Sequence, residues 1–407
     1  MIKKILKASL VASCLLTLPA CTPATKEPIK TEKKEVSSID TVALSQKALD
    51  FSKENITDVF NYNFNKDKNK SFVYSPYSHL SCVNLLNKYM KVPEDNYLNA
   101  YKDCDFSLLE LNNIKTANLL IVKKESNREI DFAEVQFADF PDEAAKKSKD
   151  LQKAILGEIL LEPKYDDPAI ETVGINATKF FGLWSEAFDK SATIRNKFTL
   201  VNGKIIEVDK MYSGDFAEDS PYAYEDDKVK MYKKPILKEG GDKEVTSYAY
   251  MIMPKQISDV GEVGQNIVKY IKDFQSKADI YDEVYISMPK LNIKSELDLY
   301  DIVKNSNKNY INDLYKFNGE FKHRSNNGMK ISDLKQVATL EVDESKVEAK
   351  AITEMATEAM MAPPQENKVF EMDINKPFFF VVVSSSNVEE VEPVITFMSY
   401  VNNPVEK

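Results

Sequence analysis

The sequence predicts an α+β fold, and three observations lead to that class. Apolar residues follow the spacing of an amphipathic helix through residues 45–65. Later in the chain, runs such as VTSYAYMIMP (245–254) and KPFFFVVVSS (376–385) have the length and composition of strands. The run FTLVNGKIIEVDKMY (198–212) places Asn202-Gly203 between two alternating stretches, which is a strong hairpin signal. Helices in the first third and strands in the last two thirds indicate helices packed on extended sheets.

The other elements follow in order along the chain. A short strand, FVYS (72–75), stops at Pro76, and Ser78 is expected to cap the largely apolar helix that comes next. The run TANLLIV (116–122) reads as a buried strand. Further elements are predicted at FPDEAAKKSKDLQKAILGEIL (140–160, one or two helices), TVGINATKFFGLW (172–184, strand), EVYISMPKLNIKSEL (283–297, strand), KQVATLEVDE (335–344, alternating strand) and VITFMSYVNNP (394–404, strand).

The N-terminus resembles an export signal rather than part of the fold. MIKKILK is basic, the apolar stretch after it is too short to span a bilayer comfortably, and LPAC closes it at Cys21. A small residue before a cysteine at this place is typical of a bacterial lipoprotein. We therefore expect residues 1–20 to be a lipoprotein signal peptide and Cys21 to carry the lipid. Cys14 is a weaker candidate, and an ordinary cleaved signal with a chance cysteine stays open.

Residues 21–42 are rich in Lys, Glu, Pro, Thr and Ser, so they predict a flexible tether, and residues 43–407 predict one globular domain. The protein is then expected to be exported and anchored by its lipid at the cell envelope or cell surface. The formal net charge is -10 with acids and bases interspersed, which argues against a nucleic-acid partner.

Little in the sequence points to enzymatic chemistry. Only two histidines occur, His79 at a helix start and His323 in a polar stretch, and neither adjoins a nucleophile motif. Cys82 and Cys104 are expected to be free, partly buried thiols rather than a disulfide. No spacing typical of a metal site and no phosphate-binding glycine loop is present. We expect no catalytic residue, no metal and no cofactor.

The stretch VEAKAITEMATEAMMAPP (347–364) carries two contradictory signals. From Val347 to Thr357, every second residue is small or apolar, and the residues between them are mostly charged. That period of two is typical of a half-buried strand. The stretch nevertheless ends in Met-Met-Ala-Pro-Pro, which is typical of an exposed loop.

Seven segments, in order and covering about residues 45–405, resemble one family. YSPYSHLS (74–81) is similar to the family's FSPLSISS motif, and NATKFFGLW (176–184) is similar to NAIYFKGKW. SDLKQVATLEVDESKVEA (332–349) aligns without a gap to the segment that leads into the family's reactive loop. The other four are FTLVNGKIIEVDKMY, SMPKLNIKSELDL, NKPFFFVV and ITFMSYVNNP. On these segments the sequence is identified as a member of the serpin family.

The resemblance implies the serpin fold, with three β-sheets, eight to nine helices and an exposed reactive-centre loop at about residues 345–372. It implies suicide inhibition of a serine protease, or of a cysteine protease. The cleaved loop would enter the large sheet as a new strand and trap the covalent acyl-enzyme. The protein is expected to act as a monomer.

The resemblance also assigns roles to residues. The hinge that starts insertion is expected at Glu344, Ser345, Lys346, Val347, Ala349 and Ala351. The sheet-opening region is expected at Ser75, Ser78, Asn176, Trp184 and Gln336. The chain departs from the family at Lys346, where a glycine is usual, and at Gln336, where a histidine is usual. Because a stiffer hinge would slow insertion, a non-inhibitory surface binding protein with the same fold is the alternative.

The spacing from Glu344 that is usual in the family places the cleaved bond at Met360-Met361. Counting back from Pro377-Phe378 gives a later bond. The position of the cleaved bond is therefore left open between Met360-Met361 and a later one. An unbranched apolar residue suits a chymotrypsin-, elastase- or subtilisin-like protease. A lipoprotein hydrolase has only the export signal in its favour.

Overall fold

The structure is a computed structural model that describes residues 41–405, except 90–91, 93, 103, 125–133, 171, 217–221, 239–243, 307–330, 332, 348–367 and 387–391. The described residues belong to one compact unit. The predicted signal peptide, Cys21 and nearly all of the tether lie outside the described residues, and so do His323, Ala349, Ala351, Met360 and Met361.

Six α-helices and four short 3-10 helices lie in the described part of the chain. The α-helices are α1 (Thr41–Lys66), α2 (Pro76–Tyr89), α3 (Asp142–Leu156), α4 (Val260–Gln265), α5 (Ile267–Lys277) and α6 (Leu299–Asn305). The 3-10 helices are η1 (Tyr97–Tyr101), η2 (Phe106–Leu109), η3 (Lys190–Ala192) and η5 (Ile257–Asp259). None of the described helices is both long and apolar enough to cross a membrane.

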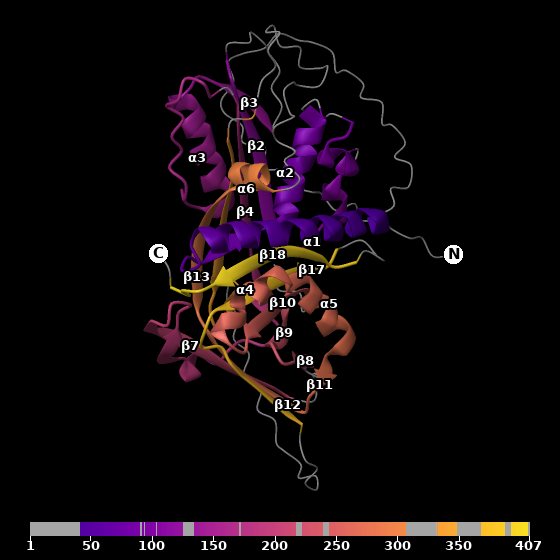
Figure 1. Ribbon diagram of the computed structural model, residues 1–407, viewed down its shortest axis with the longest axis vertical. Helices are drawn as coiled ribbons and strands as arrows, with labels where there is room; N and C mark the ends of the chain where they lie inside the picture. The colour runs from indigo at the N-terminus through magenta and orange to yellow at the C-terminus, as the bar shows by residue number, and fades with distance from the viewer. Residues whose placement is uncertain are drawn as a thin grey trace, which may run out of the picture. The chain divides into compact units, whose positions relative to one another are not determined.

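A five-stranded sheet forms the part of the molecule where α3 and α2 lie (Figure 1). Its strand order is β13-β14-β4-β2-β3, and its central strands β14 and β4 run parallel to each other. α3 packs on β4 and β2 from one face, over Val173, Ile175, Ala177 and Val337. The strands are β2 (Ile114–Lys123), β3 (Val135–Ala138), β4 (Thr172–Phe180), β13 (Leu291–Asp298) and β14 (Asp333–Val342).

A nine-stranded sheet carries the most apolar strands of the chain. β17 and β18 are buried along their whole lengths, as their continuous apolar sequences predict. The order is β1-β18-β17-β10-β9-β5-β15, with β8 pairing with β9 and β11 pairing with β8. The strands are β1 (Phe72–Tyr74), β5 (Gly182–Trp184), β8 (Tyr222–Glu225), β9 (Val229–Leu237), β10 (Val245–Pro254), β11 (Asp279–Ile280), β15 (Lys346–Val347), β17 (Phe378–Ser384) and β18 (Val394–Val401).

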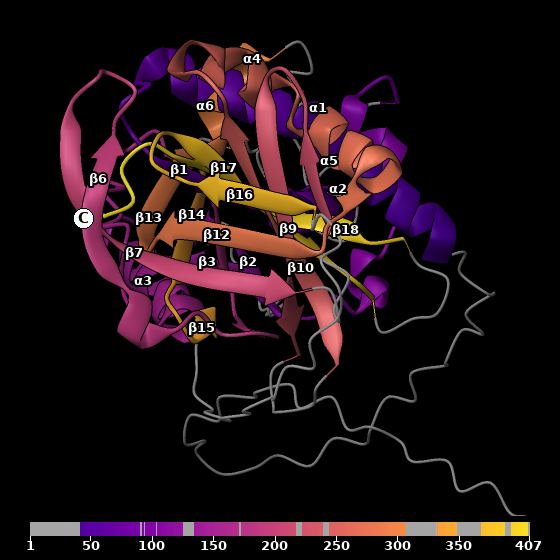
Figure 2. The ribbon, with the colours of Figure 1, turned by 90° about the horizontal axis from the view of Figure 1, so that it is seen from below.

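A four-stranded sheet completes the fold, in the order β16-β12-β7-β6 (Figure 2). The predicted hairpin at Asn202-Gly203 is confirmed, because β6 and β7 pair antiparallel across it and Gly203 has a φ of 83°. The strands are β6 (Ile194–Thr199), β7 (Ile205–Phe216), β12 (Glu283–Pro289) and β16 (Val369–Asp373).

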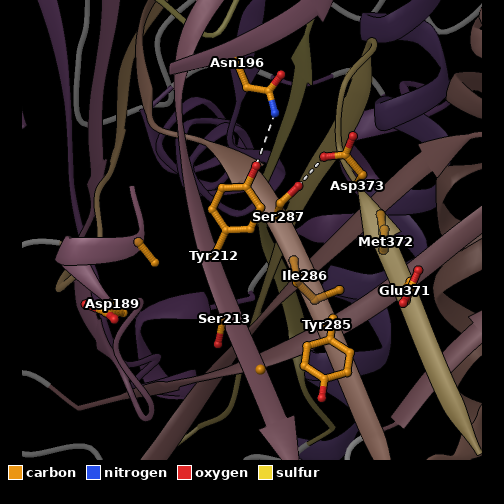
Figure 3. A pocket seen from close by; sticks show the side chains of 12 residues that line it. Asp189, Asn196, Tyr212, Ser213, Tyr285, Ile286, Ser287, Glu371, Met372 and Asp373 are labelled. Carbon is orange, nitrogen blue, oxygen red and sulfur yellow. Dashed lines mark hydrogen bonds between the residues drawn. The ribbon is translucent and has the colours of Figure 1, made fainter. Parts of the chain in front are cut away.

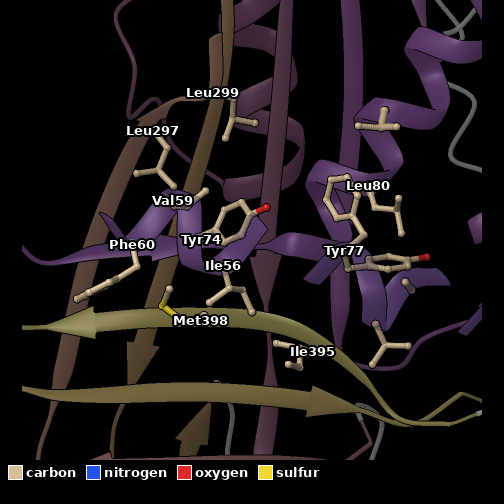
Figure 4. Close-up of a cluster of buried hydrophobic side chains, with 14 of the residues drawn as sticks. Ile56, Val59, Phe60, Tyr74, Tyr77, Leu80, Leu297, Leu299, Ile395 and Met398 are labelled. Atoms are coloured by element: carbon tan, nitrogen blue, oxygen red, sulfur yellow. The ribbon is translucent and has the colours of Figure 1, made fainter. Parts of the chain in front are cut away.

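The largest core cluster lies where α1 and α2 pack on β18 and the end of β13. Figure 4 shows Phe60 and Ile56 of α1 on the side of Met398 and Ile395 of β18, with Val59 on the side of Leu297 and Leu299. The ring of Phe60 also meets those of Tyr400 and Phe379 edge to face. The amphipathic spacing predicted for residues 45–65 therefore places one face of α1 against the nine-stranded sheet.

Substitutions at the two glycines of α4 test how tightly this helix packs on α1. An added Cβ at Gly264 would lie 2.1 Å from Cζ of Phe60, whereas one at Gly261 of the same helix would meet only Cε1 of Phe64, at 3.5 Å. We expect Gly264→Ala to lower the free energy of unfolding by about 1–3 kcal/mol through overpacking. Gly261→Ala should leave it unchanged or raise it slightly, because alanine favours a helix. Equal thermal shifts for the two variants would contradict this packing.

Five sequence predictions need correction. α2 begins at Pro76, so Ser75 rather than Ser78 caps it, and the Ser75 hydroxyl accepts from the Ser78 backbone N–H at 3.2 Å. The run 172–184 breaks at Phe181 into β4 and β5, and the run 283–297 breaks at Lys290 into β12 and β13 of different sheets. α1 begins at Thr41, inside the predicted tether.

The fifth correction concerns the thiols. Cys82 and Cys104 are free, as expected, but both are buried rather than partly buried. Cys82 is 1% exposed among the apolar residues of the largest core cluster, and burial raises its pKa to about 12. A buried protonated thiol of this kind is chemically inert.

Candidate functional site: the strand seam and its hinge

The site is organised around the boundary between β4 and β14, which we call the seam. The two strands pair in parallel from Asp333 opposite Val173 to Thr339 opposite Lys179. Gln336 lies directly opposite Asn176 in this register. Both side chains point to the α2 side of the sheet, where their bonding partners lie.

Four of the five residues predicted for sheet opening meet beneath the seam, and we call them the polar cluster: Ser75, Ser78, Asn176 and Gln336. All four are fully buried. The Gln336 side-chain amide donates to Oδ1 of Asn176 at 3.0 Å and to the Ser75 carbonyl at 3.1 Å, and its oxygen accepts from the Ser75 N–H at 2.9 Å. Glutamine thus makes three hydrogen bonds at the position where the family usually has histidine.

Asn176 extends this network across the sheet. Its Nδ2 donates to Oγ of Ser78 at 2.5 Å and to Oδ1 of Asn118 on β2 at 2.7 Å. The Ser75 hydroxyl donates to the carbonyl of Thr396 on β18 at 2.7 Å. The polar cluster therefore ties β14, β4 and β2 to α2 and to the nine-stranded sheet. Parting the seam would break the Gln336–Asn176 bond and leave buried polar atoms unpaired.

Trp184, the fifth predicted residue, lies away from the polar cluster, at the end of the seam where β14 stops. It is 3% exposed, its Nε1 donates to the Asp343 carbonyl at 3.0 Å, and its ring packs edge to face on Phe188 and Phe380. Trp184 is thus both a core aromatic and a direct contact of the chain as it leaves β14. The predicted region divides into two places: a polar cluster under the seam and an aromatic contact at its end.

Glu344, the first predicted hinge residue, is held by three contacts. Its Oε1 accepts from Lys290 Nζ at 2.7 Å and from Thr193 Oγ1 at 2.6 Å, and its carbonyl accepts from the Phe188 N–H at 2.8 Å. The side chain of Glu344 is only 7% exposed. Burial alone would raise the pKa of this carboxyl, but the hydrogen bonds from Lys290 and Thr193 hold it below its usual value.

The next hinge residues leave the five-stranded sheet. The Ser345 N–H donates to Oδ1 of Asp343 at 2.9 Å, which turns the chain. Lys346 and Val347 form β15 and pair antiparallel with Leu183 and Gly182 of β5. The described start of the hinge is therefore a strand added to β5, outside the seam.

Acid should loosen this hinge. Because the folded pKa of Glu344 lies below the unfolded value of about 4.3, its stabilising contribution is present above that pH and is lost as pH falls through the folded pKa. At pH 7, Glu344→Gln should lower the free energy of unfolding by about 1 kcal/mol, allowing for solvent at Lys290. In urea titrations, the difference in free energy of unfolding between the native protein and Glu344→Gln should close below pH 4.5.

The exposed Glu186, on the connection after β5, provides the control. Glu186→Gln removes the same charge near the hinge and should change little at any pH. A gap between the native protein and Glu344→Gln that persists at pH 3 would contradict the role assigned to the Glu344 carboxylate.

A groove of about 450 Å³ lies on the four-stranded sheet, between η3 and β16 (Figure 3). Tyr212 and Tyr285 line it, and its polar groups are bonded to one another: Asn196 donates to Tyr212, and Ser287 donates to Asp373. One side of the groove adjoins Thr193, which holds Glu344, and the other side is β16, the first strand after residues 348–367.

In the described part of the chain, His79 has a structural role and no metal-binding group of side chains is found. His79 is fully buried in α2 with its Nδ1 2.8 Å from the Tyr74 hydroxyl, which is a structural contact. In the described ranges, no three His, Cys, Asp or Glu side chains are placed to hold a metal ion together. Sequence reasoning missed Thr193 and Lys290 as partners of Glu344, and neither residue lies in a pattern that could have identified it.

Comparison with known proteins identifies the family. The model of the family described as serpin (serine protease inhibitor) matches residues 113–404. Serpin-Z2B of Triticum aestivum is 25% identical over 289 residues, covering 67% of this chain and 68% of the relative. Antichymotrypsin-2 of Bombyx mori is 28% identical over 227 residues, covering 54% of this chain and 56% of the relative.

Solved structures agree on the fold. Serpin48 from the insect Tenebrio molitor superposes with a TM-score of 0.66 at 18% identity, covering 90% of this chain and 100% of that one. The thermophilic serpin tengpin in its native state superposes with a TM-score of 0.69 at 18% identity, covering 92% and 96%. With its three sheets and its matched sequence motifs, the chain belongs to the serpin family of serine protease inhibitors.

Proposed function

We propose that this protein inhibits its target protease as a suicide substrate. The protease serine attacks the carbonyl of Met360, the peptide bond to Met361 breaks, and the new amine leaves. The acylated segment then inserts into the seam before water can hydrolyse the ester. The observation that carries this proposal is the parallel seam, combined with the strand pattern of the segment that follows β14.

A parallel pair of strands is a suitable place for such an insertion. The chain leaves β14 at Val342 and must turn back to enter the sheet, so the inserted strand would run antiparallel to β14. Because β4 is parallel to β14, the same strand would be antiparallel to β4 as well. One parallel ladder would be replaced by two antiparallel ladders, which are the more stable kind per residue.

The side chains of the inserted segment fit the two faces of the sheet if Val347 pairs with Val342 after a four-residue turn at 343–346. Ala349 would then lie between Leu340 and Phe180, which are 1% and 4% exposed on the core side of the sheet. Thr353 would lie beside Gln336, within reach of its amide. Small side chains on this face avoid overpacking a core that is already filled.

The opposite face of the inserted strand, which carries the charged residues and Ile352, also fits its neighbours. This face of the sheet is less exposed to solvent than the sequence indicates. Ile352 would lie between Val337 and Ala177, in the apolar cluster that α3 covers. Glu354 would lie beside Lys335, which already pairs with Asp298 at 2.6 Å. An isoleucine among the charged positions thus has an apolar place to occupy.

The energy is sufficient in principle. β4 and β14 offer nine and ten residues, so about ten new ladder bonds at about 0.5–1.5 kcal/mol each would contribute on the order of 10 kcal/mol. The fourteen residues from Val347 to Met360 span roughly 46 Å as a strand, so the protease would be carried across most of the domain.

The sequence supports a class of target protease and a cellular location. Met360 suits a chymotrypsin-, elastase- or subtilisin-like serine protease, and a cysteine protease with an apolar preference is the other class. The protein would act as a monomer, exported and anchored through Cys21 at the cell envelope or at the cell surface. There it would protect the envelope from proteases.

Mixing the purified protein with elastase and with subtilisin tests the proposal. We expect an adduct that survives SDS, and mass spectrometry should find the released peptide beginning at Met361. Cleavage within 348–367 by a panel of proteases, without any such adduct, would reject the inhibitory function.

The second candidate is a non-inhibitory surface binding protein with the same fold. The pairing of Lys346 and Val347 with β5 and the three contacts of Glu344 favour it, because all of them must break before insertion starts. A loop that is cleaved faster than these contacts break would behave as a substrate. The yield of adduct per cleavage separates the two candidates.

A further inference from the structure

A small pocket with an unusual set of side chains lies outside the seam, and no residue of β4 or β14 lines it. It has a volume of about 250 Å³ and forms where three segments meet: the end of β6, the residues after β10, and the link between β16 and β17. The Thr199 N–H donates to the Asn375 carbonyl at 2.8 Å, which holds two of these segments together. The lining residues are Lys197, Thr199, Lys255, Gln256, Ile257, Asn375 and Lys376, and we call this site the lysine pocket.

The lining contains three ammonium groups and no carboxylate. Lys255 pairs with Glu225 at 2.7 Å. Lys376 donates only to the Lys255 carbonyl, at 2.7 Å, and neither Lys376 nor Lys197 forms an ion pair with any described residue. The side chains of Thr199 and Gln256 make no hydrogen bond within the described ranges, so the hydroxyl and the amide of these residues can donate to a bound group.

Three carboxylates on the elements around the pocket are paired with other cations. Glu207, opposite Lys197 on β7, lies 3.5 Å from Nε of Arg195. Glu225 is shared between Lys255 and Lys230. Asp373 binds Lys210, a fully buried lysine, together with Ser287, as Figure 3 shows for the serine. Among the described residues, these three carboxylates form their ion pairs with lysines and arginines other than Lys197 and Lys376.

The electrostatics of Lys376 support the same conclusion. Burial lowers its pKa, and the positive charge of Lys230 lowers it further, while Asp373 only partly opposes this. A cation in such surroundings is stabilised by a nearby anion. Hydrogen bonds between an ammonium and an oxyanion are about twice as strong as those between neutral groups.

We propose that the lysine pocket binds a tetrahedral oxyanion, a phosphate or sulfate group, through Lys197 and Lys376 with Thr199 and Gln256 as further donors. Since a water molecule occupies about 30 Å³ of liquid, the pocket holds roughly eight waters, enough room for one group of five heavy atoms. The group is either a free ion or part of a larger polyanion. Its binding would link β6 to the β16–β17 connection.

Calorimetric titration of the intact protein, with inorganic phosphate and separately with inorganic polyphosphate, tests the proposal. Chloride should be adjusted to constant ionic strength, because exposed charges respond to salt in general. We expect saturable binding and a melting temperature raised by roughly 3.5 °C at a hundred times Kd. Lys197→Gln and Lys376→Gln should each weaken binding about tenfold or more. Lys197 is exposed, so its variant keeps the fold.

Lys204→Gln is the matched control, since Lys204 is an exposed lysine at the turn of the same hairpin and lies outside the pocket. It should bind as the native protein does. Binding of polyphosphate alone, lost in both pocket variants, would identify the group as part of a larger molecule. Equal binding by the native protein and both pocket variants, or no binding of either probe, would overturn the proposal.

Discussion

An Ala349→Arg variant should be cleaved by the target protease without trapping it. In the proposed inserted strand, Ala349 lies between Leu340 and Phe180 on the core side, and both neighbours are buried. An arginine there would have to bury an unpaired charge, which costs several kcal/mol. Insertion would stop at Ala349, the second core-facing position after Val347, and the acyl-enzyme would hydrolyse. Adduct yield on SDS gels should fall by more than tenfold, with the rate of loop cleavage unchanged.

The neighbouring residue supplies the control. Glu348→Arg changes the charge by two units instead of one, but its side chain would lie on the opposite face, beside the exposed Glu341. That change replaces two like charges with an opposite pair, so trapping should persist. If Glu348→Arg abolished the adduct and Ala349→Arg spared it, the register proposed from Val342 and Val347 would be wrong by one residue.

Asn176→Ala should loosen the seam. It removes a side chain that bonds Gln336, Ser78 and Asn118 in a fully buried site. Unsatisfied buried partners cost about 1–3 kcal/mol, so the native state should lose roughly that much in urea unfolding. Because the lost bonds tie β4 to β14, the intact loop should also insert spontaneously. We expect inhibitory activity to decay several times faster at 37 °C than in the native protein.

Asn402→Ala separates loss of stability from opening of the seam. Asn402 is equally buried and also has strong bonds, accepting from the Val201 N–H at 2.7 Å and donating to the Asn69 carbonyl at 2.6 Å, but it lies away from β4 and β14. It should destabilise the fold to a similar extent without accelerating the loss of activity. Equal decay rates for the two variants would show that the polar cluster has no special role in opening.

The sequence predicts the strands and the hairpin well, because these depend on local pattern. The continuous apolar runs of β17 and β18 and the Asn202-Gly203 turn are visible without any partner strand. The cap of α2 is misplaced by three residues, because proline at the first helical position moves the cap back to Ser75.

The site is harder to predict from pattern alone. Ser75, Asn176 and Gln336 are ordinary polar residues at scattered positions, and only the resemblance to a family assigns them one role. Glu344 has partners about fifty residues before it at Lys290 and about one hundred and fifty before it at Thr193, a separation at which no local signal exists. β9 and α5 were missed outright, although the alternating burial of β9 has the period of a strand.

Melting of the intact protein and of the protein cleaved within 348–367 tests the central claim most directly. Insertion worth on the order of 10 kcal/mol should raise the melting temperature of the cleaved form by roughly 13 °C. Identical melting temperatures for the two forms would show that the seam does not accept the segment, and the trapping mechanism would be excluded for this serpin.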